Sequence, residues 1–123
     1  MQLSIITINY NNGDGLQRTI ESVIKQNFKS YEYIVIDGGS TDKSIDVIKR
    51  NKNHINYWIS EPDTGIYNAM NKGIRKATGE YLIMINSGDV LVNEDVLDTV
   101  FKKNNNSDII YGDVLWNDNG VEY

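Results

Sequence analysis

Acidic side chains stand directly after three stretches of the sequence that have the composition of buried strands. Asp37 ends "YEYIVID", Asp89 follows "YLIMINSG" and Asp113 follows "IIYG". Ionised carboxylates only accept hydrogen bonds, and Mg²⁺ and Mn²⁺ prefer such hard oxygen ligands. Each acid also has a glycine beside it, which allows a ligand to approach the backbone closely. The pattern predicts a site for a divalent metal and a phosphate-bearing ligand.

The apolar pattern predicts strands and helices that alternate along the sequence. Short β-branched runs such as "LSIITI" are typical of buried strands, and the spacing of Leu16, Ile20 and Val23 is typical of an amphipathic helix. We expect strands at 3–8, 31–37, 55–60, 80–85 and 109–116, and helices at 15–26, 43–51, 66–77 and from Asn93 onward. This order predicts an α/β fold with a mostly parallel sheet between helices. Ligands of such sheets bind beyond the carboxyl ends of the strands, where the acids lie.

Length and composition limit the kind of protein. A chain of 123 residues with 40% hydrophobic content is sufficient for one domain with one core. The net charge of −5 argues against a nucleic-acid partner, and the absence of cysteine excludes disulfides and thiolate metal sites. No apolar run approaches the roughly 20 residues of a membrane span, and the first residues lack the basic flank of a signal peptide. We therefore expect a soluble, cytoplasmic domain without an integral membrane segment.

Two short motifs indicate other functions, but their contexts disfavour both. "GDGLQR" at 13–18 nearly matches the dinucleotide-binding fingerprint, but Arg18 replaces the third glycine and the motif begins several residues after the strand. "DTG" at 63–65 is the triplet of aspartic proteases, but here it leads into a helix, whereas that chemistry needs an all-β fold. A sugar-phosphate nucleotidyltransferase shares the α/β layout, but "NYNNGDG" after the first strand lacks the expected arginine and lysine.

Structural roles compete with functional ones for several of these residues. Asp37 before two glycines is also ordinary turn chemistry, and Asp42 is more typical of a helix cap. His54 lies in a polar segment without partner ligands nearby, so we expect a solvated loop residue. The alternative role for Asp89 is a turn or a helix cap, but Asn93 occupies the better capping position. A ligand-binding role is therefore favoured more strongly for Asp89 than for the others.

Most of the chain resembles a known enzyme family. The stretches that carry the resemblance are "SIITINYNN", "YIVIDGGSTDKS" and "SEPDTGIYNAMNKGIRKATGEYLIMINSGD". They look like the nucleotide-sugar-binding half of the inverting GT-A glycosyltransferases, a large family that includes enzymes of bacterial capsule, O-antigen and exopolysaccharide assembly. The resemblance implies a three-layer α/β/α, Rossmann-like fold. It also implies transfer of a sugar, with inversion, from a nucleotide-diphosphate sugar (a UDP-sugar) to a glycan or lipid-linked acceptor.

The same resemblance assigns residues to the nucleotide. Thr7 and Tyr10 match positions that border the base. Asp37 matches the position that accepts a hydrogen bond from the ring N–H of a uracil-like base. Asn71 and Arg75 are one helical turn apart, share a face and are implied to reach the nucleotide.

A metal site is implied at the end of the fourth strand. Asp89 matches the last acid of the family's short acidic motif, often written D-x-D, which helps to hold Mn²⁺ or Mg²⁺ against the two phosphates. The cation is implied to neutralise charge on the departing nucleoside diphosphate, and Gly88 to let the backbone approach the phosphates. Asn86 and Gly88 stand where the family commonly has acids, so Asp89 is the only carboxylate in "NSGD".

The general base is expected outside this chain. Enzymes of this family carry, beyond the nucleotide-binding half, an acceptor-binding half that supplies it, and no acid of this sequence matches that base. We therefore expect residues 1–123 to be the donor-binding portion of a truncated glycosyltransferase domain. The alternative is a non-catalytic nucleotide-sugar-binding fragment. For the cytoplasmic location expected above, one possibility is the inner face of the membrane, and an exposed sheet edge would favour self-association.

Overall fold

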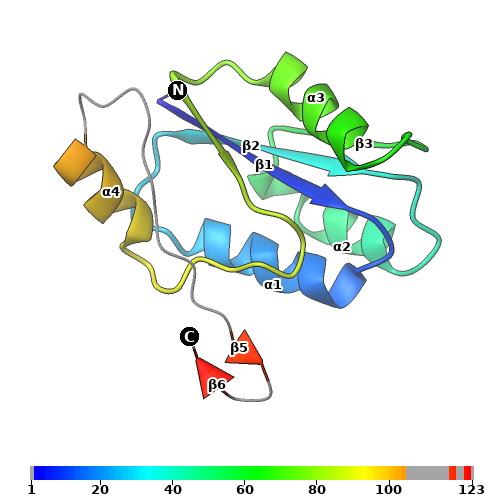
Figure 1. The fold of residues 1–123 in the computed structure, drawn as a ribbon, viewed down its shortest axis with the longest axis horizontal. Helices are drawn as coiled ribbons and strands as arrows, with labels where there is room; N and C mark the ends of the chain where they lie inside the picture. The colour runs from blue at the N-terminus through cyan, green and yellow to red at the C-terminus, as the bar shows by residue number, and fades with distance from the viewer. Residues whose placement is uncertain (1, 105–116, 119–120, 123) are drawn as a thin grey trace.

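A parallel sheet of four strands forms the centre of the structure (Figure 1). The computed structural model describes residues 2–104, 117–118 and 121–122. The strands are β1 (Leu3–Asn9), β2 (Tyr31–Asp37), β3 (Tyr57–Ser60) and β4 (Tyr81–Met84), in the spatial order β3-β2-β1-β4. The register places Asn9 opposite Asp37 and Asp37 opposite Ser60, so polar residues meet where three neighbouring strands end.

Helices cover both faces of this sheet, which confirms the predicted three-layer α/β fold (Figure 1). Their bounds are α1 (Gly13–Ile24), α2 (Ser44–Arg50), α3 (Ile66–Lys76) and α4 (Val96–Asn104), with a short 3-10 turn, η1 (Lys52–His54). The helices α1, α2 and α4 lie on one face, and α3 lies on the other. The short strands β5 (Asn117–Asp118) and β6 (Val121–Glu122) pair antiparallel.

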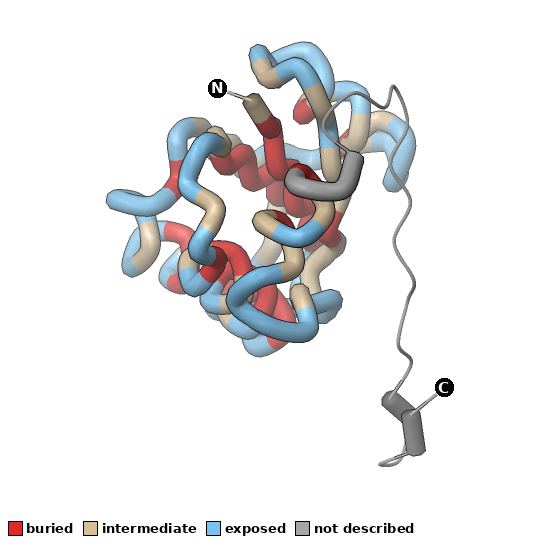
Figure 2. Tube along the Cα trace, turned by 90° about the vertical axis from the view of Figure 1, so that its left-hand side faces the viewer, coloured by how far each residue is buried: buried red, intermediate tan, exposed pale blue. Residues whose placement is uncertain are grey.

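The core has two parts, because successive side chains of a strand point to opposite faces. Leu3 and Ile5 of β1 pack toward the face of α1, where Leu16 is completely buried. Ile6 packs toward α3, where Ala69 is the buried contact residue. Figure 2 shows the result: buried segments run through the centre, and exposed segments surround them. The sheet is therefore held rigidly enough to position the loops that follow its strands.

Two helices begin at positions other than those predicted. Helix α1 starts at Gly13, two residues early, because the side chain of Asn12 accepts a hydrogen bond from the backbone N–H of Gly15 at 3.2 Å. Helix α4 starts at Val96, because Asn93 forms a turn of its own in which its side chain accepts from the N–H of Asp95 at 2.9 Å. The other strands and helices within the described ranges lie where they were predicted, to within two residues.

Two sequence-based expectations fall outside the described residues. These are the fifth strand at 109–116 and Asp113 within it. Within residues 2–104, and in the two short strands near the carboxyl terminus, no helix has the length and apolar character needed to cross a membrane.

Candidate functional site

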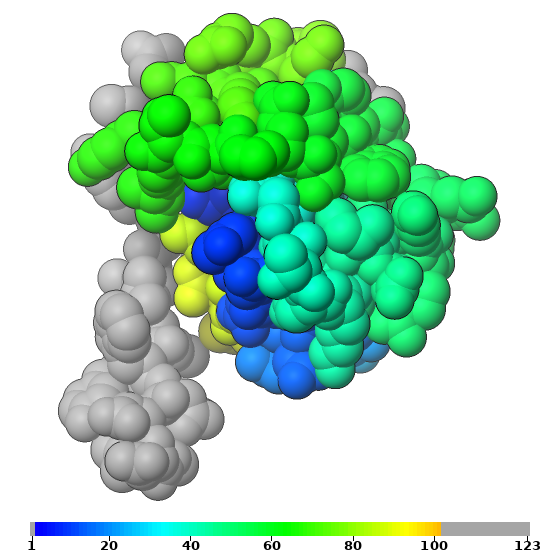
Figure 3. Space-filling view, turned by 90° about the vertical axis from the view of Figure 1, so that its right-hand side faces the viewer, coloured from blue at the N-terminus to red at the C-terminus, as the bar shows by residue number. Residues whose placement is uncertain are grey.

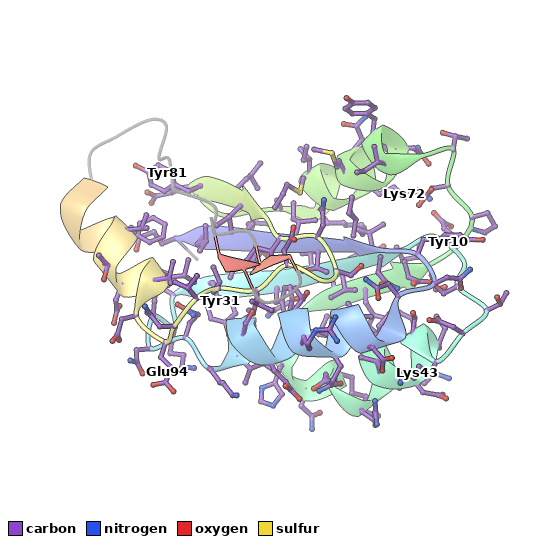
Figure 4. The ribbon with its side chains drawn as sticks, turned by 60° about the horizontal axis from the view of Figure 1, so that its bottom comes forward. Tyr10, Tyr31, Lys43, Lys72, Tyr81 and Glu94 are labelled. Carbon is purple, nitrogen blue, oxygen red and sulfur yellow. The ribbon has the colours of Figure 1, made fainter. Side chains whose placement is uncertain are left out.

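The loops after β1, β2, β3 and β4 meet at one edge of the sheet, which we call the rim (residues 9–12, 37–42, 60–65 and 86–89). They meet because all four strands run parallel and end there. Figure 3 looks onto the rim, where α3 (green) lies above the segments after β1 (blue) and β2 (cyan). Tyr10 and Lys72 lie at this end of the molecule, and Tyr31 and Tyr81 lie at the opposite end (Figure 4).

A cavity of about 370 Å³ opens at the rim. This volume is within the range of pockets that hold small organic ligands. One wall is apolar and includes the start of α3, and the polar side chains come from the end of β1 and from the segments that follow β1, β3 and β4. The lining residues are Ile8, Asn9, Tyr10, Asp63, Gly65, Ile66, Ala69 and Asn86. Tyr10, predicted from the sequence as a base-binding residue, is therefore part of the cavity wall and is 64% exposed.

Asp37 is completely buried and organises the loop that follows β2. One carboxylate oxygen accepts hydrogen bonds from the Asn9 amide (2.8 Å) and the Ser40 hydroxyl (2.7 Å). The other accepts from the Ser60 hydroxyl (2.7 Å) and from the backbone N–H groups of Ser40 (2.8 Å) and Gly39 (3.2 Å). Burial alone would raise the pKa of Asp37, but these hydrogen bonds favour the ionised form and lower it overall.

The burial and the hydrogen bonds of Asp37 disfavour the direct contact with a base that was predicted for this residue. A carboxylate that is already bound by five donors and has no exposed surface is well suited to hold a loop in shape. The structure therefore favours a supporting role for Asp37 over a direct hydrogen bond to a base.

Thr7 lies beneath the rim and also has no exposed surface. Its hydroxyl is 2.8 Å from the phenol oxygen of Tyr33, on the face of the sheet that packs against α1. Burial raises the pKa of that phenol, so the pair is a neutral hydrogen bond. Its position favours a supporting role for Thr7 over the predicted contact with a base.

Asn71 and Arg75 are exposed on α3 and do not line the cavity. The helix begins at the rim with Ile66 and runs back across the sheet, so Arg75 lies about 13 Å along its axis from that residue. Lys72, on the same helix, does reach the rim: its ammonium group pairs with Glu61 at 3.1 Å and donates to the carbonyl of Pro62 at 3.3 Å. Lys72 thus fixes the loop that carries Asp63.

The loop after β4 is a tight turn that presents Asp89 to solvent. The N–H of Asp89 donates to the carbonyl of Asn86 at 2.9 Å, and Gly88 adopts a φ of 98°, which favours glycine. Thr19 of α1 anchors the turn, because its hydroxyl donates to the Asp89 carbonyl (2.7 Å) and accepts from the Gly88 N–H (2.9 Å). No residue in the described ranges donates a hydrogen bond to the Asp89 carboxylate, so that group is available to a ligand.

A divalent cation is compatible with this single carboxylate. Nowhere in the described part of the chain do three or more histidine, cysteine, aspartate or glutamate side chains gather as a metal site. Mg²⁺ usually keeps several waters and is bound by one or two carboxylates together with substrate phosphates. The exposed Asp89 supplies a hard oxygen donor of that kind, and the remaining ligands would be phosphate and water.

Sequence reasoning missed three residues that shape this site. Asp63 lines the cavity, but no role was predicted for it, although its triplet "DTG" lies in one of the stretches that carry the family resemblance. Thr19 lies within a predicted amphipathic helix and Asn9 at the end of a buried strand, and the sequence around each gives no signal of its hydrogen bonds to other loops. The position of Asp63 directly after β3, at the rim, was the signal that could have identified it.

The fold and the rim define an α/β domain with a ligand site at the carboxyl ends of a parallel sheet. Residues 4–122 match the model of Glycosyl transferase family 2, and the chain belongs to that family. An uncharacterized glycosyltransferase of Mycobacterium tuberculosis is 45% identical over 96 residues, which are 77% of this chain and 37% of that protein. The poly(ribitol-phosphate) beta-N-acetylglucosaminyltransferase TarP of Staphylococcus aureus is 36% identical over 118 residues. The match covers 90% of this chain and 36% of TarP. The chain thus spans little more than a third of either relative.

Solved structures share the same GT-A architecture. The mannosyltransferase PcManGT from Pyrobaculum calidifontis, solved with GDP-Man and Mn²⁺, superposes with a TM-score of 0.75 at 22% identity, over 82% of this chain and 31% of that chain. TarS of Staphylococcus aureus, solved with UDP-GlcNAc, superposes with a TM-score of 0.74 at 23% identity. The match covers 85% of this chain and 32% of the TarS chain. At these identities the likeness establishes the fold.

Proposed function

We propose that this chain is the donor-binding portion of an inverting, metal-dependent glycosyltransferase that uses a UDP-sugar. The sugar is transferred to a glycan or to a lipid-linked acceptor, in the biosynthesis of a cell-surface polysaccharide. One observation carries the proposal: the rim holds a carboxylate, Asp89, that has no partner among the described residues and lies on an anchored turn, and the loop that bears it also contributes Asn86 to the cavity wall. A carboxylate for a cation and a cavity for a base, placed on one rim, are the two features that a nucleotide diphosphate requires.

Each part of the rim then has a task. The cavity beside Tyr10 receives the base, and the turn at Gly88 keeps the backbone free of side chains next to the diphosphate. Asp89 holds the cation, Mn²⁺ or Mg²⁺. When bound, this cation supplies positive charge against the negative charge that develops on the departing nucleoside diphosphate. Asp37 and Lys72 keep the loops after β2 and β3 in position.

The comparisons support this choice of substrates. TarP is named for transfer of N-acetylglucosamine to poly(ribitol phosphate), and the two solved neighbours hold nucleotide sugars, one of them with Mn²⁺. We place the general base in an acceptor-binding portion outside these 123 residues. The proposed task of this chain by itself is to bind the nucleotide sugar.

Calorimetric titration of the chain with UDP, in the presence and absence of Mn²⁺, tests the proposal. We expect Mn²⁺ to tighten UDP binding, and Asp89→Asn to remove most of that gain, about tenfold or more, because the charge that holds the cation is lost. The matched control is Glu80→Gln, which also removes one negative charge. Glu80 is exposed and directly precedes β4, whereas Asp89 follows that strand at the rim. Mn²⁺-dependent affinity that is unchanged in Asp89→Asn would contradict the proposed metal site.

A further inference from the structure

The position after Asp37 has no side chain, and an acid from another loop fills the space that it leaves. A Cβ placed on Gly38 would lie 2.9 Å from Oδ2 of Asp63, and 3.4 Å from the ring of Tyr10. The loop after β2 therefore provides no side chain at the cavity wall at this point. The loop after β3 provides a carboxylate in the same place.

The loops after β2 and β3 are fixed to one another, so this placement is not accidental. The N–H of Glu61 donates to the carbonyl of Asp37 at 3.0 Å, and the Ser60 hydroxyl donates to its carboxylate at 2.7 Å. Lys72 holds the same loop from the side of α3, through Glu61 and Pro62. Asp63 is thus presented to the cavity by a loop that is anchored on two sides.

The carboxylate of Asp63 has capacity for a ligand, and that of Asp37 does not. Oδ1 of Asp63 accepts one hydrogen bond, from the N–H of Gly65 at 3.2 Å. No donor from the described residues reaches Oδ2, and the side chain is half-buried in the cavity wall. Asp37, in contrast, is enclosed and bound by five donors.

The rest of the cavity wall suits a flat heterocycle. Ile8, Ile66 and Ala69 form an apolar wall, and Tyr10 adds an aromatic ring beside the carboxylate. An ionised carboxylate accepts hydrogen bonds and cannot donate one. It therefore pairs with a ring N–H, which uracil and guanine present, and it repels the ring-nitrogen lone pair that cytosine and adenine present at the corresponding edge.

We propose that Asp63 is the residue that selects the base of the nucleotide donor, and that it selects bases with a ring N–H. This inference rests on the proposed function, because it assigns the cavity to the base. It transfers the base contact from the buried Asp37 to the loop after β3.

The test compares the affinities of UDP, GDP, CDP and ADP for the chain in the presence of Mn²⁺, by calorimetry. We expect the wild type to bind UDP, GDP or both about tenfold or more tightly than CDP and ADP, as one hydrogen bond to a charged group allows. Asp63→Asn should reduce this ratio to near one, because an amide can both donate and accept. Asp63→Ala should weaken UDP and GDP specifically.

Controls separate this inference from the proposed function. Glu80→Gln removes one negative charge at an exposed position just before β4, at the end of the sheet away from the rim, and should keep the preference for ring N–H bases, while thermal unfolding verifies that each variant folds. A wild type that binds none of the four nucleotides overturns both the proposed function and the role of Asp63. A wild type that prefers UDP or GDP, with the preference intact in Asp63→Asn, overturns the role of Asp63 alone. Equal affinity of the wild type for all four nucleotides also overturns base selection.

Discussion

The hydroxyl of Thr19 is hydrogen bonded to both Gly88 and Asp89: it accepts from the N–H of Gly88 at 2.9 Å and donates to the carbonyl of Asp89 at 2.7 Å. Thr19 is completely buried in α1, so one side chain of a helix in the rigid core fixes the turn that carries the proposed cation ligand. The position of the Asp89 carboxylate thus depends on the packing of α1 against the sheet.

Thr19→Val should destabilise the protein by about 1–3 kcal/mol, because the N–H of Gly88 and the carbonyl of Asp89 lose their part-buried hydrogen-bond partner. It should also weaken Mn²⁺-dependent UDP binding, since Asp89 is no longer held in place. Urea unfolding and calorimetry measure the two effects. Thr19→Ser is the matched control, because it keeps the hydroxyl and should retain most of the affinity. Equal losses of UDP affinity in the two variants would argue against an anchoring role for the hydroxyl.

Asp37→Ala should destabilise the protein more strongly, by about 3 kcal/mol. The substitution leaves the amide of Asn9 and the hydroxyls of Ser40 and Ser60 without their common acceptor. UDP affinity should fall with and without Mn²⁺, because the loops after β2 and β3 lose their common anchor. Stability from urea unfolding tests this supporting role. A variant as stable as the wild type that has nonetheless lost UDP binding would restore the direct base contact predicted from the sequence.

The α/β architecture and the position of the rim were predictable from the sequence. Buried β-branched runs such as the one ending at Asn9 alternate with helical spacings, and the order of elements then determines where parallel strands end. The position of Asp89 at the rim was predictable as well, because this residue closely follows a predicted strand of the parallel sheet.

The partners inside the site were not predictable, because they are decided by distances between loops. The sequence places Asp37 at the rim but does not show that five donors surround it. It does not show either that Asp63 occupies the space beside Gly38, which is 25 positions away in the chain. Thr7 and Arg75 illustrate the same limit: the pattern gives the element on which each lies, and the packing decides whether it is buried or far from the cavity.

Gly73→Ala should destabilise the protein although alanine favours helices. A Cβ at this position of α3 would lie 2.5 Å from the Cγ2 atom of Ile6 on β1. Overpacking of this kind costs about 1–3 kcal/mol, and the gain in helix propensity is roughly 1 kcal/mol. We therefore expect a net loss of stability of up to about 2 kcal/mol, measured by urea unfolding. Asn71→Ala, at an exposed position of the same helix, should have little effect, and an equally stable Gly73→Ala variant would show that α3 packs less closely on the sheet.

The lowered pKa of Asp37 predicts that the protein loses stability in acid. An unfolded aspartate has a pKa of about 3.9, and the folded value lies below it because the hydrogen bonds of Ser40, Asn9 and Ser60 outweigh the cost of burial. Between the two values the unfolded chain binds more protons than the folded chain, so the free energy of unfolding rises with pH. The stabilisation is complete above about pH 5 and is lost as the pH falls through the folded pKa.

Urea unfolding between pH 3 and pH 6 measures this dependence. The wild type should become steadily less stable below about pH 5, and Asp37→Asn should show a shallower slope, because its side chain does not titrate. Some slope should remain in the variant, since the pKa of Glu32 is also lowered. Burial opposes that shift, but hydrogen bonds from Ser4 and Thr78 outweigh it. Identical slopes for wild type and Asp37→Asn would mean that the buried carboxylate does not carry the acid sensitivity.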